Sequence, residues 1–155
     1  MASASEITRK AKSNLAFALR ILPKGRRDDV IVFYAFCRTV DDIADDVKVP
    51  KEDRRQALQA WEDGIRKGFP EGHGLGNELE EMMARRGIPQ KWLLEIIGGC
   101  GMDLEVQRFQ GWEELSRYNW KVAGVVGLAC TRLFGCVHED SDKYAELLGN
   151  ALQLT

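Results

Sequence analysis

Apolar side chains recur at helical spacing along almost the whole chain of 155 residues, and this periodicity limits the folds open to it. Val30, Phe33 and Cys37, for example, fall three and four positions apart, which places them on one face of a helix. The period-two alternation that is typical of a half-buried strand is absent. The valine-rich stretch 122–126 is open to interpretation as a strand, but its flanks continue a helical pattern.

Glycine and proline residues divide the helical pattern into separate elements. A loop is expected over 68–76 because five of its nine residues are glycine or histidine and one is proline. Gly135 is placed to end a helix as a C′ residue. The pattern predicts a single all-α domain over residues 1–155, a helical bundle with helices at about 5–20, from 26, from 51, 77–86, 90–109, 112–134 and from 141.

Composition excludes several classes of protein. Hydrophobic residues make up 45% of the chain and charged residues 30%, an ordinary globular balance, and the net charge of −2 argues against nucleic-acid binding. The four cysteines stand singly in apolar segments, as expected for buried thiols in a reducing compartment. No signal peptide and no membrane-spanning stretch are visible, so a cytoplasmic protein is expected, with peripheral membrane contact and the oligomeric state left open.

One predicted helix carries a polar stripe that points to a binding site. Positions 34, 38, 41 and 45 are four, three and four residues apart, so their side chains share one face: Tyr34, Arg38, Asp41 and Asp45. Carboxylates near a helix C-terminus repel one another and oppose the helix dipole, so a cation is expected to offset them. Magnesium prefers oxygen ligands and keeps places for water and phosphate, and the stripe therefore predicts a magnesium–diphosphate site.

Two further carboxylates follow on the same segment. Asp42 and Asp46 point about 100° away from the stripe by helical geometry. We expect Asp42 to be a secondary metal ligand and Asp46 to be solvated. A solvated acidic helix end is an equally good interpretation of the spacing taken alone.

The last predicted helix stops abruptly. It begins near Ser141 and reaches Thr155 without a glycine, a proline or a cationic residue to cap it. Its final carbonyl groups would be left to water in mid-helix. This pattern predicts a truncated chain.

Several motifs, taken together, resemble the squalene/phytoene synthase family. The acidic helix is similar to the first aspartate-rich motif of that family, and residues 149–155 resemble the start of the second. The matching blocks occur in the order of the family: Leu22-Pro23, Arg38-Thr39-Val40-Asp41-Asp42-Ile43-Ala44-Asp45, Gly101-Met102-Asp103-Leu104, Tyr118 to Gly127, and Gly149 to Thr155. The resemblance implies an isoprenoid synthase fold that is truncated before the second aspartate-rich motif.

The resemblance also implies a reaction. Two farnesyl or geranylgeranyl diphosphates would be joined head to head, giving presqualene diphosphate and squalene, or phytoene. Magnesium on Asp41 and Asp45, with Asp42 as a further ligand, would assist the loss of diphosphate. Arg38 would grip phosphate oxygens and Tyr34 would bind the same diphosphate, so both are also candidates for catalysis.

Other residues receive roles from the resemblance alone. Tyr118 is implied to be catalytic, in proton removal or in steering the carbocation. Val122, Gln153, Ser13 and Asn14 are implied to contact substrate. Phe36 and Trp120 are candidates to stabilise carbocations through their aromatic faces. Gly124 and Gly127 fit either a substrate groove or close helix packing, and Asp103 and Glu105 receive no role from their chemistry.

Alternatives remain open at this point. A non-catalytic assembly protein of the same family would keep the helices, but the retained Asp41 and Asp45 argue against it. A terpene cyclase or a head-to-tail prenyl synthase would use similar acidic helices. NADPH would be a second cofactor if the product is squalene, although the chain carries no nucleotide-binding fingerprint.

Overall fold

The computed structural model describes residues 3–10, 22–105 and 108–155, and these residues form helices and connecting turns without strands. The elements are α1 (Ala4–Lys10), α3 (Lys24–Asp45), α4 (Lys51–Lys67), α5 (Leu75–Arg86), α6 (Gln90–Met102), α7 (Trp112–Asn119), the π-helical turn η2 (Trp120–Gly124), α8 (Val125–Phe134) and α9 (Ser141–Gln153). The all-α architecture predicted from the sequence is confirmed.

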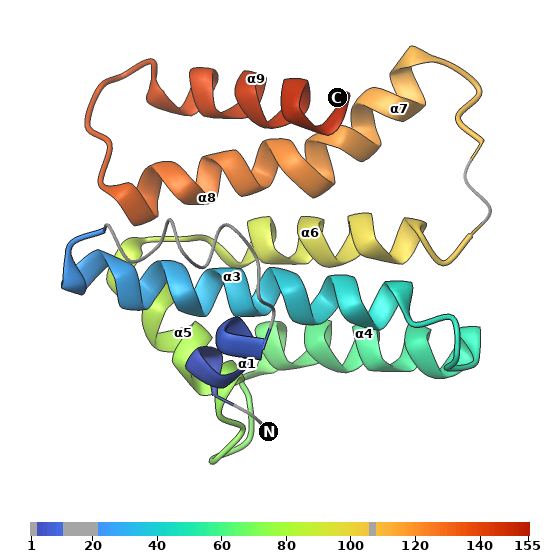
Figure 1. Cartoon of the computed structure of the whole chain (residues 1–155), viewed down its shortest axis with the longest axis horizontal. Helices are drawn as coiled ribbons and strands as arrows, with labels where there is room; N and C mark the ends of the chain where they lie inside the picture. The colour runs from blue at the N-terminus through green and yellow to red at the C-terminus, as the bar shows by residue number, and fades with distance from the viewer. Residues whose placement is uncertain (1–2, 11–21, 106–107) are drawn as a thin grey trace.

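The helices are arranged in two layers around α3 and α6. α3 packs against α4, α5 and α6, while α7, η2 and α8 run as one long rod above them and α9 folds back along α8 (Figure 1). The short α1 contacts α3. The carboxyl end of α3, the end of α6 and the start of the α7–α8 rod therefore lie at one end of the molecule.

Large apolar side chains fill the core of the lower layer. Phe36 of α3 is fully buried and meets Trp61 of α4 edge to face, with ring centroids 5.7 Å apart. Trp61 in turn contacts Phe69 at 5.3 Å and His73 at 5.5 Å, so the expected loop 68–76 covers the core with aromatic rings. These contacts anchor α3, a helix of 22 residues, on the lower layer.

A buried ion pair ties α3 to α5. The carboxylate of Asp29 is 3% exposed and receives hydrogen bonds from Arg85, at 2.8 Å, and from Arg86, at 2.5 Å. Burial by itself would raise the pKa of Asp29, but the two guanidinium groups hold it below its ordinary value. The carboxylate stays charged because each of its oxygens has a cationic donor.

Two helices differ from the sequence-based prediction. α6 ends at Met102 rather than near 109, because the amides of Asp103, Leu104 and Glu105 turn back onto carbonyls three residues earlier. Glu105 then pairs with Lys51 and Arg55 of α4, which fixes this turn. The expected helix 112–134 is interrupted by the π-helical turn η2. Gly135 ends α8 with φ +65°, as predicted, and the remainder of the first predicted helix lies outside the described residues.

Candidate diphosphate-binding site

A polar cavity lies where the two layers meet at the carboxyl end of α3. Its volume is about 290 Å³. Three of the four residues of the predicted stripe line it, and they face side chains from α6, α7, η2, α8 and α9. The lining residues are Tyr34, Cys37, Arg38, Asp41, Ile96, Cys100, Asp103, Tyr118, Val122, Val126 and Gln153.

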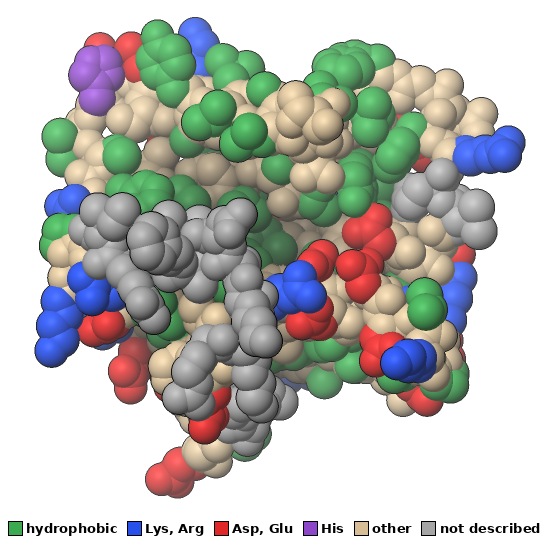
Figure 2. Space-filling view, viewed as in Figure 1, with side chains coloured by type: hydrophobic (Ala, Val, Ile, Leu, Met, Phe, Trp, Pro, Cys, Tyr) green, Lys and Arg blue, Asp and Glu red, His purple; other side chains and the backbone are tan. Residues whose placement is uncertain are grey.

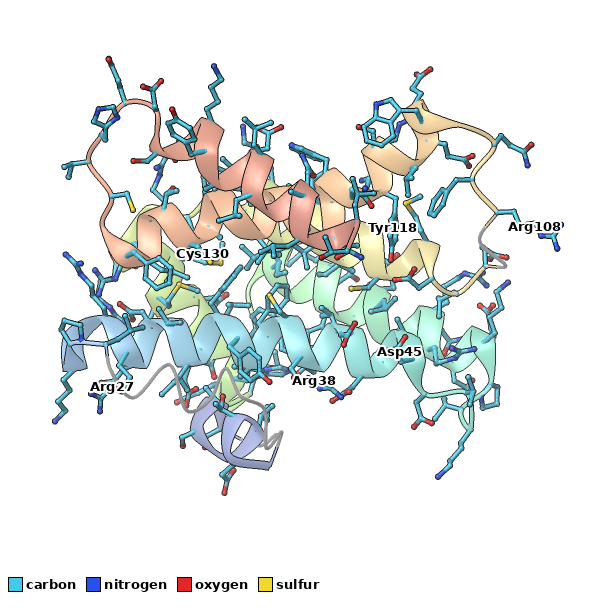
Figure 3. The ribbon with its side chains drawn as sticks, turned by 45° about the horizontal axis from the view of Figure 1, so that its top comes forward. Arg27, Arg38, Asp45, Arg108, Tyr118 and Cys130 are labelled. Atoms are coloured by element: carbon cyan, nitrogen blue, oxygen red, sulfur yellow. The ribbon has the colours of Figure 1, made fainter. Side chains whose placement is uncertain are left out.

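The acidic residues of α3 divide between the cavity and the solvent. Asp41 lines the cavity, whereas Asp45 is exposed one turn further along the same helix (Figure 3). Burial and then the neighbouring Asp45 raise the pKa of Asp41, and Arg38 only partly opposes them. Negative charge at this helix end is therefore under-compensated in the protein alone.

Arg38 lies between two carboxylates. Its Nη1 atom is 3.6 Å from Asp41 Oδ2, and its Nε donates to Asp42 Oδ2 at 3.1 Å. Asp42 does not line the cavity; it faces a separate hollow between α3 and α4 that Arg38 also borders. The structure thus brings Asp42 to the arginine rather than to Asp41 and Tyr118.

Tyr118 faces α3 from the opposite side of the cavity. Figure 3 shows it on the helix across from Arg38 and Asp45. Its ring contacts Phe109 with centroids 5.2 Å apart, and Asp103 lines the same cavity. Burial and then the Asp103 carboxylate raise the pKa of Tyr118, so the phenol is neutral at physiological pH.

Asp103 is a cavity residue that sequence reasoning missed. It follows directly after α6, where the chain turns, and its carboxylate interacts with Tyr118. Its pKa is raised by burial and, to a lesser degree, by Asp45, while the Tyr118 phenol opposes the shift. The available signal was its place in the motif Gly101-Met102-Asp103-Leu104, just ahead of the helix that carries Tyr118.

The π-helical turn sets which side chains face the cavity. Tyr118 lies just before it, Val122 within it and Val126 just after it, and all three line the cavity although they are spaced by four. A regular α-helix has 3.6 residues per turn, so each step of four residues turns the side chain about 40° further round the helix axis. The π-helical turn holds more residues per turn, which removes part of this rotation and keeps the three side chains on one face.

An apolar groove adjoins the polar cavity. Its volume is about 800 Å³, and it runs between α8 and α9. Val122, Val126 and Gln153 line both spaces, so the groove and the cavity are neighbours. Figure 2 shows hydrophobic side chains gathered below α8 and α9, with acidic side chains beside them at the end of α3. An amphiphile with an anionic head and an apolar tail matches this arrangement.

Glycines let α8 and α9 approach closely. A Cβ atom on Gly127 would lie 2.3 Å from the carbonyl oxygen of Ala145, and one on Gly149 would lie 2.4 Å from that of Ala123. Gly127 also lines the groove. Close helix packing is therefore what requires glycine at position 127, which was one of the two interpretations left open.

Other predicted residues lie elsewhere. Phe36 belongs to the core and Trp120 does not line the cavity, so neither faces a ligand there. Ser13 and Asn14 lie outside the described residues. Cys37 and Cys100 line the cavity wall, but burial raises the pKa of both, that of Cys100 to about 12. They are neutral thiols at physiological pH.

The donor set fits a hard divalent cation. Asp41 and Asp45 offer oxygen ligands only, and burial, followed by the neighbouring Asp45, raises the pKa of Asp41. In the part of the chain that the structure describes, no three His, Cys, Asp or Glu side chains are already grouped as a metal site. Magnesium suits this situation because it needs only one or two carboxylates and completes its shell with phosphate and water.

Comparison with known proteins identifies the family of this chain. A sequence model described as squalene/phytoene synthase matches residues 8–155. The chain belongs to the squalene/phytoene synthase family, as the motifs predicted.

Two enzymes of this family show the degree of sequence similarity. The chain is 35% identical over 155 residues to the presqualene diphosphate synthase of Zymomonas mobilis subsp. mobilis, covering 99% of this chain and 53% of that protein. It is 32% identical over 163 residues to the 15-cis-phytoene synthase of Paracoccus sp., with the same coverage. The chain spans about half the length of the curated relatives it matches.

Solved structures agree on the fold. The squalene synthase HpnC from Alicyclobacillus acidocaldarius superposes with a TM-score of 0.82 at 27% identity, over 97% of this chain and 57% of that one. A dehydrosqualene synthase in complex with ligand superposes with a TM-score of 0.80 at 24% identity, over 97% of this chain and 53% of that one, and shows the fold alone. No helix among the described residues has the length and apolar content that crossing a membrane requires.

Proposed function

We propose that the cavity binds the diphosphate of an allylic prenyl diphosphate and that the groove between α8 and α9 receives its isoprenoid tail. The observation that supports this is that the two spaces adjoin, since Val122, Val126 and Gln153 line both. The cavity carries an arginine and carboxylates, and the groove is apolar. A lipid phosphate matches both environments, because it has a charged head and an apolar tail.

We further propose head-to-head condensation of two such diphosphates, as the names of the relatives suggest. Asp41 and Asp45 would hold magnesium, which would supply positive charge against the departing diphosphate. Arg38, held in place by Asp42, would donate to phosphate oxygens, and Tyr34 would donate to the same group. Asp42 thereby becomes a residue that orients Arg38, in place of the metal ligand expected from the sequence.

The choice of substrate and product belongs to the same proposal. Relatives named for presqualene diphosphate and for phytoene are both about one-third identical to this chain. Farnesyl diphosphate with presqualene diphosphate or squalene as product, and geranylgeranyl diphosphate with phytoene as product, are therefore both carried forward. NADPH enters only if squalene is the product. We place the protein in the cytoplasm, with peripheral contact to a membrane that holds isoprenoids.

Titration calorimetry tests the binding step directly. We expect a thio-substituted farnesyl diphosphate to bind the chain in the presence of magnesium and to bind at least about tenfold more weakly without it. Asp41→Asn and Asp45→Asn should each weaken the magnesium-dependent binding by about tenfold or more. Equal heats with and without magnesium would contradict the proposal.

Asp46→Asn is the matched control. Asp46 follows the same helix and carries the same charge, but it faces the hollow between α3 and α4. The substitution should leave the affinity within about twofold, since Asp46 borders the other hollow and does not share the helix face of Asp41 and Asp45. If Asp46→Asn weakened binding as much as Asp41→Asn, a general electrostatic attraction would replace the specific site.

A further inference from the structure

The π-helical turn η2 lies between two helices, and each of them presents a glycine to it. Figure 1 shows the rod that contains η2 between α6 and α9, and both helices contact the turn. The glycine of α6 is Gly99, which is buried, and the glycine of α9 is Gly149. A π-helical turn closes its hydrogen bonds over five residues and is wider than an α-helical turn, so the helices beside it must leave it room.

On the α6 side, the close contact is with Val122. A Cβ atom on Gly99 would lie 2.6 Å from Val122 Cγ1 and 3.1 Å from Lys121 Cβ. Carbon atoms in favourable contact are about 3.5 to 4.0 Å apart, so an atom at 2.6 Å would have to move. Val122 has little freedom to turn aside, because a β-branched side chain in a helix strongly prefers one χ1 rotamer.

The turn itself is held on both sides. A Cβ atom on Gly149 would lie 2.4 Å from the carbonyl oxygen of Ala123, so α9 already touches the backbone of η2. Lys121 also forms a partly buried ion pair with Glu95, which ties the turn to α6. A Cβ atom added on α6 would therefore displace the Val122 side chain and not the whole turn.

The open space beside Val122 is the cavity and the groove. Val122 lines both, together with Val126 and Gln153, and these three residues form the boundary between the two spaces. A Val122 side chain that is pushed off Gly99 moves into this open space, because the other sides are occupied by α6 and α9. An isoprenoid tail that starts in the cavity has to pass the same boundary to reach the groove.

We propose that Gly99 is a positioning residue that keeps Val122 clear of the boundary and so determines the length of isoprenoid tail that the site admits. A long allylic diphosphate needs the boundary to be open, whereas a short one is held in the cavity alone. This inference rests on the proposed function for the nature of the ligand. The contact between Gly99 and Val122 can be measured without any ligand.

A denaturation cycle tests the contact alone. Gly99→Ala should lower the midpoint of urea denaturation, and the same substitution combined with Val122→Ala should lower it by less than half as much relative to Val122→Ala, because the Cγ atoms are gone. Gly98→Ala is the matched control, since its Cβ atom would meet only the flexible end of Lys121, 3.4 Å from Nζ. It should leave the midpoint unchanged or raise it slightly, because alanine favours the helix. Equal losses in the two backgrounds, or failure of the double variant to fold, would show that Val122 is not the obstacle and would overturn the inference.

A comparison of tail lengths tests the consequence for binding. The probes are the thio-substituted dimethylallyl and farnesyl diphosphates, each titrated in the presence of magnesium. Gly99→Ala should weaken binding of the farnesyl analogue about tenfold and that of the dimethylallyl analogue by no more than about twofold. Gly99→Ala with Val122→Ala should recover most of the affinity for the farnesyl analogue, and Gly98→Ala should bind both analogues like the original chain.

The possible outcomes separate the two proposals. An equal loss for both analogues would show that Gly99 acts on the fold as a whole, and no loss for either would show that the boundary does not limit the tail; each result would overturn the inference. If the original chain binds neither analogue, the proposed function is contradicted. The denaturation cycle then still decides whether Gly99 positions Val122.

Discussion

The lower helical layer and the α8–α9 pair are packed by opposite means. In the lower layer, large side chains such as Phe36, Leu79 and Leu93 are completely buried between helices. In α9, by contrast, no residue is buried, and the helix meets α8 through Gly127 and Gly149, where backbones come close together. The large side chains of α9 stay largely exposed, and Leu148, at 61% exposure, and Leu152, at 65%, line the groove beside α8.

This difference has a consequence for the site, because the cavity has walls from both regions. Arg38 and Asp41 stand on the well-packed α3, whereas Val126 and Gln153 stand on the α8–α9 pair. The diphosphate end is therefore carried by a rigid scaffold. The apolar end is lined by a helix pair that buries little side-chain surface, so we expect it to open locally at lower free energy.

The largest effect should follow from removing a core ring of the lower layer. Phe36→Ala deletes a fully buried side chain that packs on Trp61, and we expect the free energy of unfolding to fall by about 3 to 5 kcal/mol. Urea denaturation followed by circular dichroism measures this. A loss below about 1 kcal/mol would show that the two regions do not differ as described.

Breaking the ion pair between α3 and α5 should cost less. Asp29→Asn leaves Arg85 and Arg86 without their carboxylate, and we expect a loss of about 2 to 3 kcal/mol at neutral pH. Because the pKa of Asp29 lies below its ordinary value of 3.8, the pair stabilises the fold above that pH and loses this effect as the pH falls further. The difference between the original chain and the variant should therefore shrink in titrations below about pH 4. A difference that stays constant down to pH 2 would argue against the pair.

Adding a methyl group between α8 and α9 tests whether their close backbone approach requires glycine. Gly127→Ala places a Cβ atom against the backbone of Ala145, and we expect a loss of about 1 to 3 kcal/mol in thermal or urea unfolding. Gly101→Ala is the control, since nothing lies within 4 Å of its Cβ position in α6. Alanine there should be neutral or slightly stabilising because it favours the helix. Equal effects at both positions would remove close backbone approach as the explanation.

The smallest effect on stability is expected from the exposed leucines of α9 that line the groove. Leu148→Gln combined with Leu152→Gln should change the free energy of unfolding by no more than about 0.5 kcal/mol per residue, since both side chains are already exposed. Leu133→Gln in α8, at a fully buried position, should be strongly destabilising in the same assay. A large loss from the α9 variant would mean that these leucines are covered in solution.

Much of the fold was predictable because it depends on local pattern. Helical periodicity and the glycine and proline breaks located the helices to within a few residues, and the four–three–four spacing placed Tyr34, Arg38 and Asp41 on one face. The family was predictable because its motifs are contiguous. The end of α6 was missed because ion pairs from Glu105 to the distant α4 help to hold the turn, and no local signal reports them.

The cavity was predictable only in part, because it is assembled by tertiary contacts. Asp103 could not be assigned from its neighbours in sequence, since Tyr118, which lines the same cavity, is fifteen positions away on another helix. Asp42 was predicted to be a secondary metal ligand, and the sequence did not reveal that it receives a hydrogen bond from the half-exposed Arg38 and borders a different hollow. The role of Asp29 was likewise hidden, because its partners lie on α5.

The single wide turn at Trp120–Gly124 holds one residue more than a regular helix would need to bring Tyr118 and Val126 to the same face. Seven steps of an ordinary helix, at about 100° each, already come close to two full turns. Deleting one residue there would therefore let the rod wind as an ordinary helix and leave Tyr118 close to its present direction. Deleting a second residue would rotate the amino side of the rod by about 100° and take Tyr118 out of the cavity. In an alignment of related sequences, a one-residue gap at this point is therefore compatible with the same cavity, and a two-residue gap is not.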